Sequence, residues 1–241
     1  MKPYYSDDYV DLYLGDALEV MAGLPDLSAA AVITDPPYTD RTHSSTRMKR
    51  TSSKTSAVIE AGITTFTSIS DEDLEAALVE AGRISSGWVI ATLDYRHAVL
   101  FDEHPPAGLK CQRVGVWVKT NPTPQITGDR PAQGWEAIAY LHRAKGRSKW
   151  HGGGAHGNYV TPIAPPEGHP TAKPLSIISD LVRKFTDPGD RILDPFAGSG
   201  TTLRAAKDLG RRAIGVEINE AYCDLAARRL SQEVLDLGGL S

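Results

Sequence analysis

Asp194-Pro195-Phe196-Ala197-Gly198-Ser199-Gly200-Thr201 is the stretch that decides the fold of this chain. It follows the short run Arg191-Ile192-Leu193 and precedes residues with helical spacing as far as about Leu209. Two glycines in a strand-to-helix turn permit tight backbone geometry and the close approach of a ligand. In open parallel sheets, ligands bind outside the carboxyl ends of the strands. The stretch therefore predicts a ligand-binding loop in an α/β fold.

The next apolar run, Arg212 to Val216, ends at Glu217, where an acid can accept hydrogen bonds from ribose hydroxyls as in dinucleotide folds. The loop lacks the full Gly-x-Gly-x-x-Gly pattern and has no Gly-Lys-Ser/Thr for phosphates, so a cofactor without phosphates fits it better. A sharp turn alone would account for Gly198 and Gly200. It would not account for the whole Asp-Pro-Phe-x-Gly-Ser-Gly-Thr string.

A second motif, Asp35-Pro36-Pro37-Tyr38, follows the apolar run Ala29 to Thr34, which has the composition of a strand buried on both faces. Asp35 and the Pro36 carbonyl can each accept one hydrogen of a planar amine, so the motif has the groups of a site that holds such an amine. The two prolines stiffen the turn, and Tyr38 offers a face for stacking.

Strand-like and helix-like segments alternate along the chain, which predicts an α/β fold with a mainly parallel sheet and helices on both faces. Strands are expected at 9–14, 29–34, 88–92, 112–119, 136–141, 191–194 and 212–217. Helices are expected at 17–24, 71–83 after an N-cap at Ser70, 174–185 with Pro174 as first residue, 201–209 and 220–237. Residues 39–62, rich in Ser, Thr, Arg and Lys, predict a long mobile loop.

Composition places the chain among ordinary globular proteins, with a formal net charge of −4 over 241 residues. Cys111 and Cys223 form no Cys-x-x-Cys pair, which indicates a reduced, cytoplasmic protein. We expect no membrane association, because no apolar run approaches the roughly 20 residues of a membrane helix. No common metal pattern is present either: the spacing of His142, His151, His156 and His169 favours solvated loop residues.

Together, the two motifs resemble those of the DNA amino-methyltransferases, the N6-adenine and N4-cytosine family that uses S-adenosylmethionine (AdoMet). The amine motif precedes the cofactor motif, an order that resembles the circularly permuted β class. His169-Pro170-Thr171-Ala172-Lys173-Pro174 resembles the motif at the edge of the AdoMet pocket, with Ala172 where the family usually has Gln. Gly15-Asp16 matches the acid that reads the cofactor's adenine. Trp117-Val118-Lys119-x-Asn121 and Trp135-Glu136 are also similar to family sequences.

The resemblance implies one Rossmann-like methyltransferase domain over residues 1–241, with its AdoMet-binding half at 169–241, S-adenosylhomocysteine as product and no metal. Its catalytic residues would be Asp35, Pro36, Pro37 and Tyr38. Its cofactor-binding residues would be Asp16, Lys173, Asp194, Phe196, Ala197, Gly198, Ser199, Gly200, Thr201, Glu217 and Ile218. An Asp-initial motif favours adenine N6 of a flipped-out base. The alternatives are cytosine N4, an RNA or protein substrate, and a silent AdoMet- or DNA-binding scaffold.

Double-stranded DNA is the partner that this resemblance implies, with a homodimer as the assembly and a bacterial or phage-encoded modification enzyme as the setting. Phosphate contacts need only a basic face, so local clusters count for more than net charge. One cluster lies in the 39–62 loop, and a second lies in a short target-recognition region at 144–168. The expected DNA-binding residues are Arg41, Arg47, Lys49, Arg50, Lys54, Lys145, Arg147 and Lys149.

Overall fold

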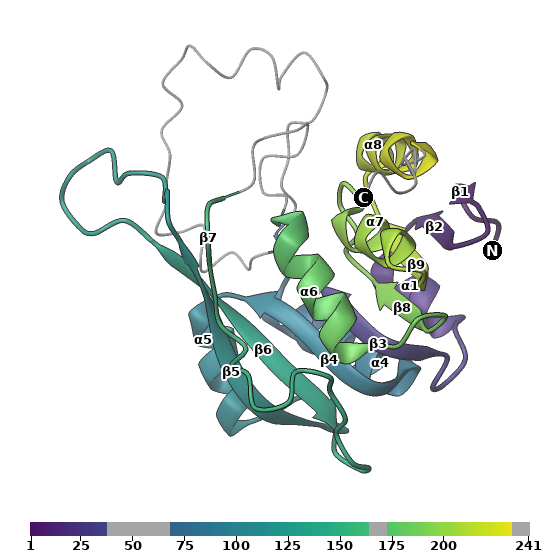
Figure 1. Cartoon of the computed structure of the whole chain (residues 1–241), viewed down its shortest axis with the longest axis horizontal. Coiled ribbons are helices and arrows are strands. Elements are labelled where there is room, and N and C mark those ends of the chain that lie inside the picture. Colours follow the sequence, from purple (N-terminus) through teal and green to yellow (C-terminus); the bar gives the residue numbers. More distant parts are fainter. Residues whose placement is uncertain (38–67, 164–172, 233–241) are drawn as a thin grey trace, which may run out of the picture.

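The computed structural model describes residues 1–37, 68–163 and 173–232. Within these ranges a nine-stranded sheet forms the centre of the molecule (Figure 1). Its strands are β1 (Tyr5–Ser6), β2 (Val10–Leu14), β3 (Ala29–Thr34), β4 (Ser85–Leu93), β5 (Leu109–Lys119), β6 (Trp135–Arg143), β7 (Tyr159–Thr161), β8 (Arg191–Asp194) and β9 (Arg212–Glu217). The helices are α1 (Ala17–Ala22), α4 (Asp71–Ile84), α5 (Tyr95–Glu103), α6 (Leu175–Phe185), α7 (Thr201–Asp208) and α8 (Glu220–Ser231).

The sheet is parallel through its middle and antiparallel at its sides. Its strand order is β1-β2-β9-β8-β3-β4-β6-β5-β7. The five strands from β2 to β4 in this order run in one direction. β6 is antiparallel to both β4 and β5, β7 is parallel to β5, and β1 is antiparallel to β2. The mainly parallel α/β fold expected from the sequence is therefore confirmed.

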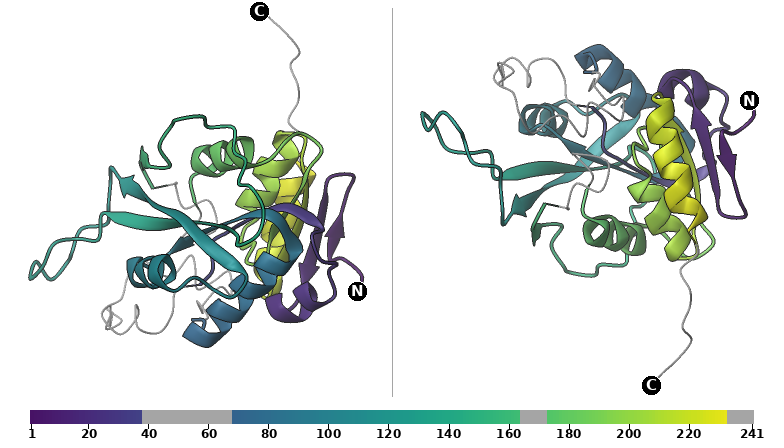
Figure 2. Two further views of the ribbon diagram at one scale, coloured as in Figure 1. Left: turned by 90° about the horizontal axis from the view of Figure 1, so that it is seen from below. Right: turned by 90° about the horizontal axis from the view of Figure 1, so that it is seen from above.

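Helices cover both faces of the sheet (Figure 2). α6, α7 and α8 contribute to one hydrophobic cluster, and α1, α4 and α5 contribute to the other. Successive residues of a strand point to opposite faces. In β4, Trp88 and Ile90 join the first cluster while Val89 and Ala91 join the second. Burial on both faces is the physical reason that this strand is apolar almost throughout.

Three elements were not expected from the sequence: β1, α5 and β7. Several boundaries also differ, and β4 and β5 each begin three residues earlier than expected, at Ser85 and Leu109. Pro174 is the N-cap of α6 and not its first residue, because its ψ of 126° is extended while its carbonyl already accepts from the Ile177 and Ile178 amides. α8 ends at Ser231, short of the expected 237, and residues 233–241 lie outside the described ranges.

β3 and β8 are neighbours at a switch point of the sheet. From β8 the chain passes through α7 on one face to β9, whereas from β3 it reaches β4 through α4 on the opposite face. Connections that diverge in this way leave a crevice at the carboxyl ends of the two strands, where ligands bind in open α/β sheets. The two sequence motifs begin at these two strand ends.

Gly215 in β9 lies beneath the loop that follows β8. A Cβ atom there would stand 2.5 Å from a Leu203 methyl carbon and 3.2 Å from the Ala197 Cβ. We expect Gly215→Ala to lower the free energy of unfolding by about 1–3 kcal/mol, because an overpacked core forces side chains and backbone to shift. The matched control is Gly87→Ala in β4, whose Cβ would meet the Ala30 carbonyl at 3.4 Å and the His142 ring at 3.8 Å, both ordinary contact distances. Urea unfolding that leaves both variants equally stable would contradict this packing.

Candidate active site

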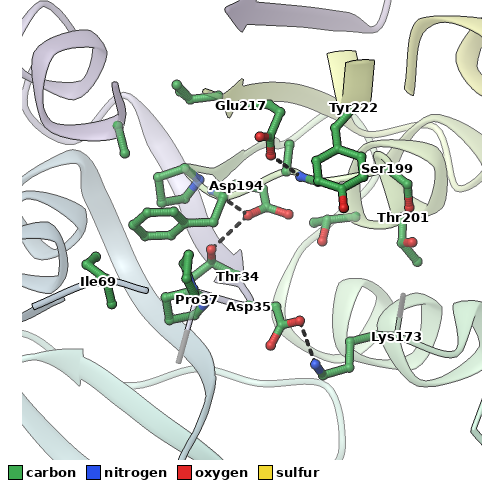
Figure 3. Close-up of a pocket in the computed structure, with 18 of the residues that line it drawn as sticks. Thr34, Asp35, Pro37, Ile69, Lys173, Asp194, Ser199, Thr201, Glu217 and Tyr222 are labelled. Atoms are coloured by element: carbon green, nitrogen blue, oxygen red, sulfur yellow. Dashed lines mark hydrogen bonds and ion pairs between the residues drawn. The ribbon is translucent and has the colours of Figure 1, made fainter. Parts of the chain in front are cut away.

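A cavity of about 710 Å³ opens at the carboxyl ends of β3 and β8. Figure 3 shows residues of both sequence motifs pointing into it. Of the predicted site residues, those that line the cavity are Asp16, Asp35, Pro36, Pro37, Lys173, Asp194, Phe196, Ala197, Gly198, Ser199, Thr201, Glu217 and Ile218. Tyr38 lies outside the described residues, and Gly200 does not line the cavity. The fold therefore brings together two motifs that are far apart in the sequence.

The loop after β8 depends on two glycines with positive φ angles. Gly198 has φ 51° and Gly200 has φ 79°, in the left-handed region that favours glycine. Gly200 is also the N-cap of α7, and a Cβ on it would stand 3.0 Å from the Ala226 side chain. Gly200 thus sets the backbone conformation of the loop on the side that packs against Ala226. Gly198, Ser199 and Thr201 form the cavity wall.

Glu217, at the end of β9, reaches across to this loop. One carboxylate oxygen accepts from the Gly198 amide at 2.8 Å and the other accepts from the Asn219 amide at 2.8 Å. Burial raises the pKa of Glu217, against the effect of these two amides. Each oxygen retains acceptor capacity, and the side chain lines the cavity. Glu217 can therefore fix the loop and accept hydrogen bonds from a ligand.

Asp194 joins the strands that carry the two motifs. Its Oδ1 accepts from the Thr34 hydroxyl at 2.8 Å and from the Phe196 amide at 3.1 Å. Burial raises the pKa of Asp194 to about 6. We expected this residue to bind a cofactor; it lines the cavity, but the contacts of its Oδ1 are to the protein. Asp194 therefore ties β3 to the loop that follows β8.

The buried carboxyl of Asp194 gives a pH-dependent prediction. Its pKa is about 6 in the folded protein and about 3.9 in an unfolded chain. The folded state thus holds this proton more tightly, so stability is greatest below the unfolded pKa and is lost as pH rises through 6. Relative to Asp194→Asn, the wild-type protein should lose up to about 3 kcal/mol of unfolding free energy between pH 4 and pH 8.

Urea unfolding of wild type and Asp194→Asn at several pH values measures this difference. Asn keeps a carbonyl oxygen for the Thr34 and Phe196 donors and carries no charge. Asp8→Asn, at an exposed acid, is the matched control and should show no comparable trend. A constant difference between wild type and Asp194→Asn across the range would contradict the raised pKa.

Asp35 projects from the end of β3 toward the cavity, with its side chain 31% exposed. The Thr92 hydroxyl donates to its Oδ1. The Lys173 ammonium lies 2.5 Å from its Oδ2, and Figure 3 shows the two side chains pointing toward one another. Both carboxylate oxygens are therefore held by the protein before any ligand enters.

Lys173 was expected to contact a cofactor, and that role stays a prediction. The structure places its ammonium between two carboxylates at the cavity. Its Nζ lies 2.5 Å from Asp35 Oδ2 and 3.2 Å from Glu136 Oε2. Glu136 also pairs with Lys119, at 2.6 Å. Burial raises the pKa of Glu136, but the charges and hydrogen bonds of Lys173 and Lys119 outweigh it, so the pKa is lowered overall.

Glu136, Lys119 and Thr92 were not singled out as site residues from the sequence. The first two lie in the segments Trp135-Glu136 and Trp117-Val118-Lys119, which were noted only as similar to family sequences. A further signal was available: an acid at the start of one apolar strand and a lysine at the end of another. Thr92 carries no such local signal, because its contact with Asp35 depends on strand packing.

The structure does not bring the second basic cluster to the cavity. The Lys149 carbonyl accepts from Trp88 near the start of β4, and the Lys149 ammonium lies 3.8 Å from Asp187, just before β8. These contacts place the cluster at the amino-terminal edge of the parallel strands, opposite the cavity. DNA binding by Lys145, Arg147 and Lys149 stays a prediction, and Arg41, Arg47, Lys49, Arg50 and Lys54 lie outside the described residues.

Much of the expected target-recognition region packs into the fold. The Trp150 ring contacts Phe185, and the Gly157 carbonyl accepts from the Tyr140 hydroxyl at 2.8 Å. Further along, β7 pairs with β5. Among the described residues, the loop 120–134 between β5 and β6 projects from the body (Figure 1), and its Thr123 lines the cavity. Target recognition by residues 144–168 stays a prediction.

Two general properties hold for the described part of the chain. No group of three or more His, Cys, Asp or Glu side chains within it is arranged to hold a metal ion. None of its helices has both the length and the apolar character needed to cross a membrane.

Comparison with known proteins identifies relatives across nearly the whole chain. A family model described as DNA methylase matches residues 142–228. The type II methyltransferase M.HinfI of Haemophilus influenzae is 28% identical over 267 residues, covering 96% of this chain and 71% of M.HinfI. The type II methyltransferase M.XycI of Xanthomonas campestris pv. cyanopsidis is 33% identical over 129 residues, covering 48% of this chain and 42% of M.XycI.

Solved structures share the fold. The M1.HpyAVI–SAM complex has a TM-score of 0.66 at 23% identity, covering 92% of this chain and all of that one. The cytosine-N4-specific PvuII DNA methyltransferase has a TM-score of 0.74 at 17% identity, covering 96% of this chain and 90% of that one. The family match, the relatives and the motifs around one cavity together make this chain similar to the DNA methylases of the N6-adenine/N4-cytosine family.

Proposed function

We propose that this chain transfers a methyl group from AdoMet to the N6 amino group of adenine in double-stranded DNA. The observation that carries the proposal is the position of Asp35, held through both oxygens, at the same cavity as the 194–201 loop. A rigid acceptor beside a nucleoside-binding loop is what direct methylation of a weakly nucleophilic amine requires.

The cavity fits AdoMet in size and in the groups that it offers. Its volume of about 710 Å³ lies within the ordinary range for small-molecule sites. Glu217 would accept from the ribose hydroxyls, and Asp16, the N-cap of α1, would lie toward the adenine. The loop offers no lysine-bearing phosphate pattern, in keeping with a cofactor that has no phosphate. When bound, AdoMet supplies an electrophilic methyl group.

Asp35 would accept one hydrogen of the target amine and stabilise the positive charge that develops on its nitrogen. The nitrogen–carbon bond forms as the sulfur–carbon bond breaks, and the nitrogen then releases one proton. Asp35, which already accepts that hydrogen bond, is the group placed to receive the proton. A base within a duplex cannot reach this cavity, so the base must be flipped out at a cost of a few kcal/mol.

The chain's relatives support DNA as the substrate, and its Asp-initial motif supports adenine over cytosine. M.HinfI and M.XycI are type II methyltransferases, and the matching family model is described as DNA methylase. The structural likeness to a cytosine-N4-specific enzyme makes cytosine N4 the second candidate. The homodimer implied by the family resemblance stays a prediction, which light scattering of the purified protein would test.

Mass spectrometry of nucleosides tests the proposal directly. The purified protein is incubated with AdoMet and unmethylated duplex DNA, and the DNA is then digested to nucleosides. N6-methyladenine is the expected product. If N4-methylcytosine forms, the proposed mechanism stands but the target base is cytosine. If neither product forms while calorimetry still detects AdoMet binding, DNA methylation is excluded. The chain would then act on RNA or protein, or bind AdoMet without catalysis.

A further inference from the structure

Four charged side chains form a line along the wall of the cavity. Lys119 lies 2.6 Å from Glu136, Glu136 lies 3.2 Å from Lys173, and Lys173 lies 2.5 Å from Asp35. They come from the end of β5, the start of β6, the residue before Pro174 and the end of β3. Their charges alternate along the line, so each inner member has an opposite charge on either side. We call these four residues the charge line.

Burial differs along the charge line in a way that bears on function. The side chains of Lys119, Glu136 and Lys173 are 16%, 12% and 8% exposed, whereas that of Asp35 is 31% exposed. All four side chains line the cavity, and Asp35 is the most exposed of them, next to three more deeply buried charges that compensate one another. Removing one partner of a buried pair costs more than the pair contributes, because the remaining charge is left uncompensated. The line is thus a rigid support for its exposed end.

The contacts of Asp35 restrict how its carboxylate can turn. Lys173 holds Oδ2 and Thr92 holds Oδ1, so rotation about the terminal bond would break both hydrogen bonds. Each carboxylate oxygen can accept more than one hydrogen bond. The lone pairs of Asp35 that remain free therefore have a fixed direction before an amine binds. An acceptor that is preorganised in this way needs no further reorganisation during the reaction.

Charge balance explains why Lys173 needs Glu136. A sulfonium cofactor and a methylated amine both carry positive charge close to Asp35. An ammonium paired only with Asp35 would weaken the carboxylate's attraction for that charge. Glu136 forms an ion pair with the same ammonium, at 3.2 Å, and so compensates its positive charge. Lys119 forms an ion pair with Glu136 and compensates the negative charge of that carboxylate. Lys173 can thus orient Asp35 without adding a net positive charge to the cavity.

The geometry points to Lys173 as a positioning residue for Asp35, supported by Glu136 and Lys119, in place of the cofactor contact expected from the sequence. This inference rests on the proposed function, since it assigns how the amine acceptor of that reaction is held. A misplaced acceptor lowers the rate of the chemical step, whereas a lost cofactor contact weakens cofactor binding. Loss of a positioning residue should therefore lower kcat, whereas loss of a cofactor contact should raise the Kd for AdoMet.

The test compares Lys173→Met, Glu136→Gln and the double variant with the matched control Lys184→Met. Lys184 is also a paired lysine, 2.7 Å from Asp180 in α6, and it does not line the cavity. We expect Lys173→Met to lower kcat by about 10²-fold, since small misplacements of reacting groups have effects of this size. The Kd for AdoMet, measured by calorimetry, should change by no more than about three-fold, and Lys184→Met should resemble wild type.

Glu136→Gln preserves side-chain volume, so it gives the same test if Lys173→Met unfolds. Because Glu136 acts through Lys173, the double variant should be no slower than Lys173→Met alone, a non-additivity that independent sites do not show. A Kd raised ten-fold or more, with kcat recovered at saturating AdoMet, would make Lys173 a cofactor contact and overturn the inference. So would an unchanged kcat. Wild-type protein that methylates no DNA would instead refute the proposed function.

Discussion

Asp35→Ala should lower kcat for methyl transfer by about 10²–10³-fold, the effect of removing one preorganised electrostatic partner from a reacting centre. Without the carboxylate, the amine loses the acceptor that stabilises positive charge on its nitrogen. AdoMet binding should be nearly unchanged, because the loop after β8 is held by Asp194 and Glu217 and makes no described hydrogen bond with Asp35. Rates at saturating AdoMet, together with calorimetric Kd values, measure the two effects separately.

Asp26→Ala is the matched control for this substitution. Asp26 is also an acid paired with a cation, lying 2.6 Å from Arg83, but it is 71% exposed and outside the cavity. Exposed ion pairs contribute little to stability, so this variant should retain wild-type activity. Equal losses of methyl transfer and AdoMet binding in Asp35→Ala would mean that Asp35 supports the shape of the cavity and does not act on the amine.

Glu217→Ala should have the largest effect on the cofactor. We expect the Kd for AdoMet to rise about 10–100-fold, because hydrogen bonds to a charged group contribute about 1.5–3 kcal/mol. The substitution also releases the Gly198 and Asn219 amides, each now held at 2.8 Å. The cavity wall therefore loses a ligand contact and a support for the loop. Calorimetric titration of AdoMet gives the result directly.

Glu220→Ala provides the comparison, because Glu220 is an exposed acid three residues further along the chain. It should bind AdoMet as wild type does. At saturating AdoMet, Glu217→Ala should regain much of its kcat, since the charge line around Asp35 is untouched. A Kd equal to that of wild type would show that Glu217 makes no contact with the cofactor and only accepts hydrogen bonds from the Gly198 and Asn219 amides.

The central strands and both motifs could be predicted from the sequence because local patterns specify them. A strand buried on both faces is apolar over its whole length, as in β3, and an N-cap such as Ser70 precedes a run of acids. The elements that sequence reasoning missed depend on other parts of the chain. β7 has only three residues and exists by pairing with β5, and α5 is a short helix that buries His97, Ala98 and Phe101.

The same distinction applies to the site. Asp35 and the 194–201 loop belong to contiguous motifs, and the fold places Asp35 and all of the loop except Gly200 at one cavity. Their catalytic and cofactor-binding roles stay predictions. The support of Asp35 was not predictable, because it depends on register: β5 and β6 are antiparallel, with Trp117 opposite Glu136. Lys173 shows the limit of a motif, since the motif predicted a residue at the cavity while the fold decided which group it contacts.

The hydrogen bond from Thr34 to Asp194 joins residues 160 positions apart. During synthesis, β3 therefore leaves the ribosome long before the strand that will lie beside it. Until β8 arrives, one edge of β3 presents unpaired backbone groups, the kind of edge that invites wrong partners. Contacts of such long range also slow folding. A nascent chain therefore contains the Asp35 motif from early on, whereas the cavity beside it forms only when β8 and β9 are in place.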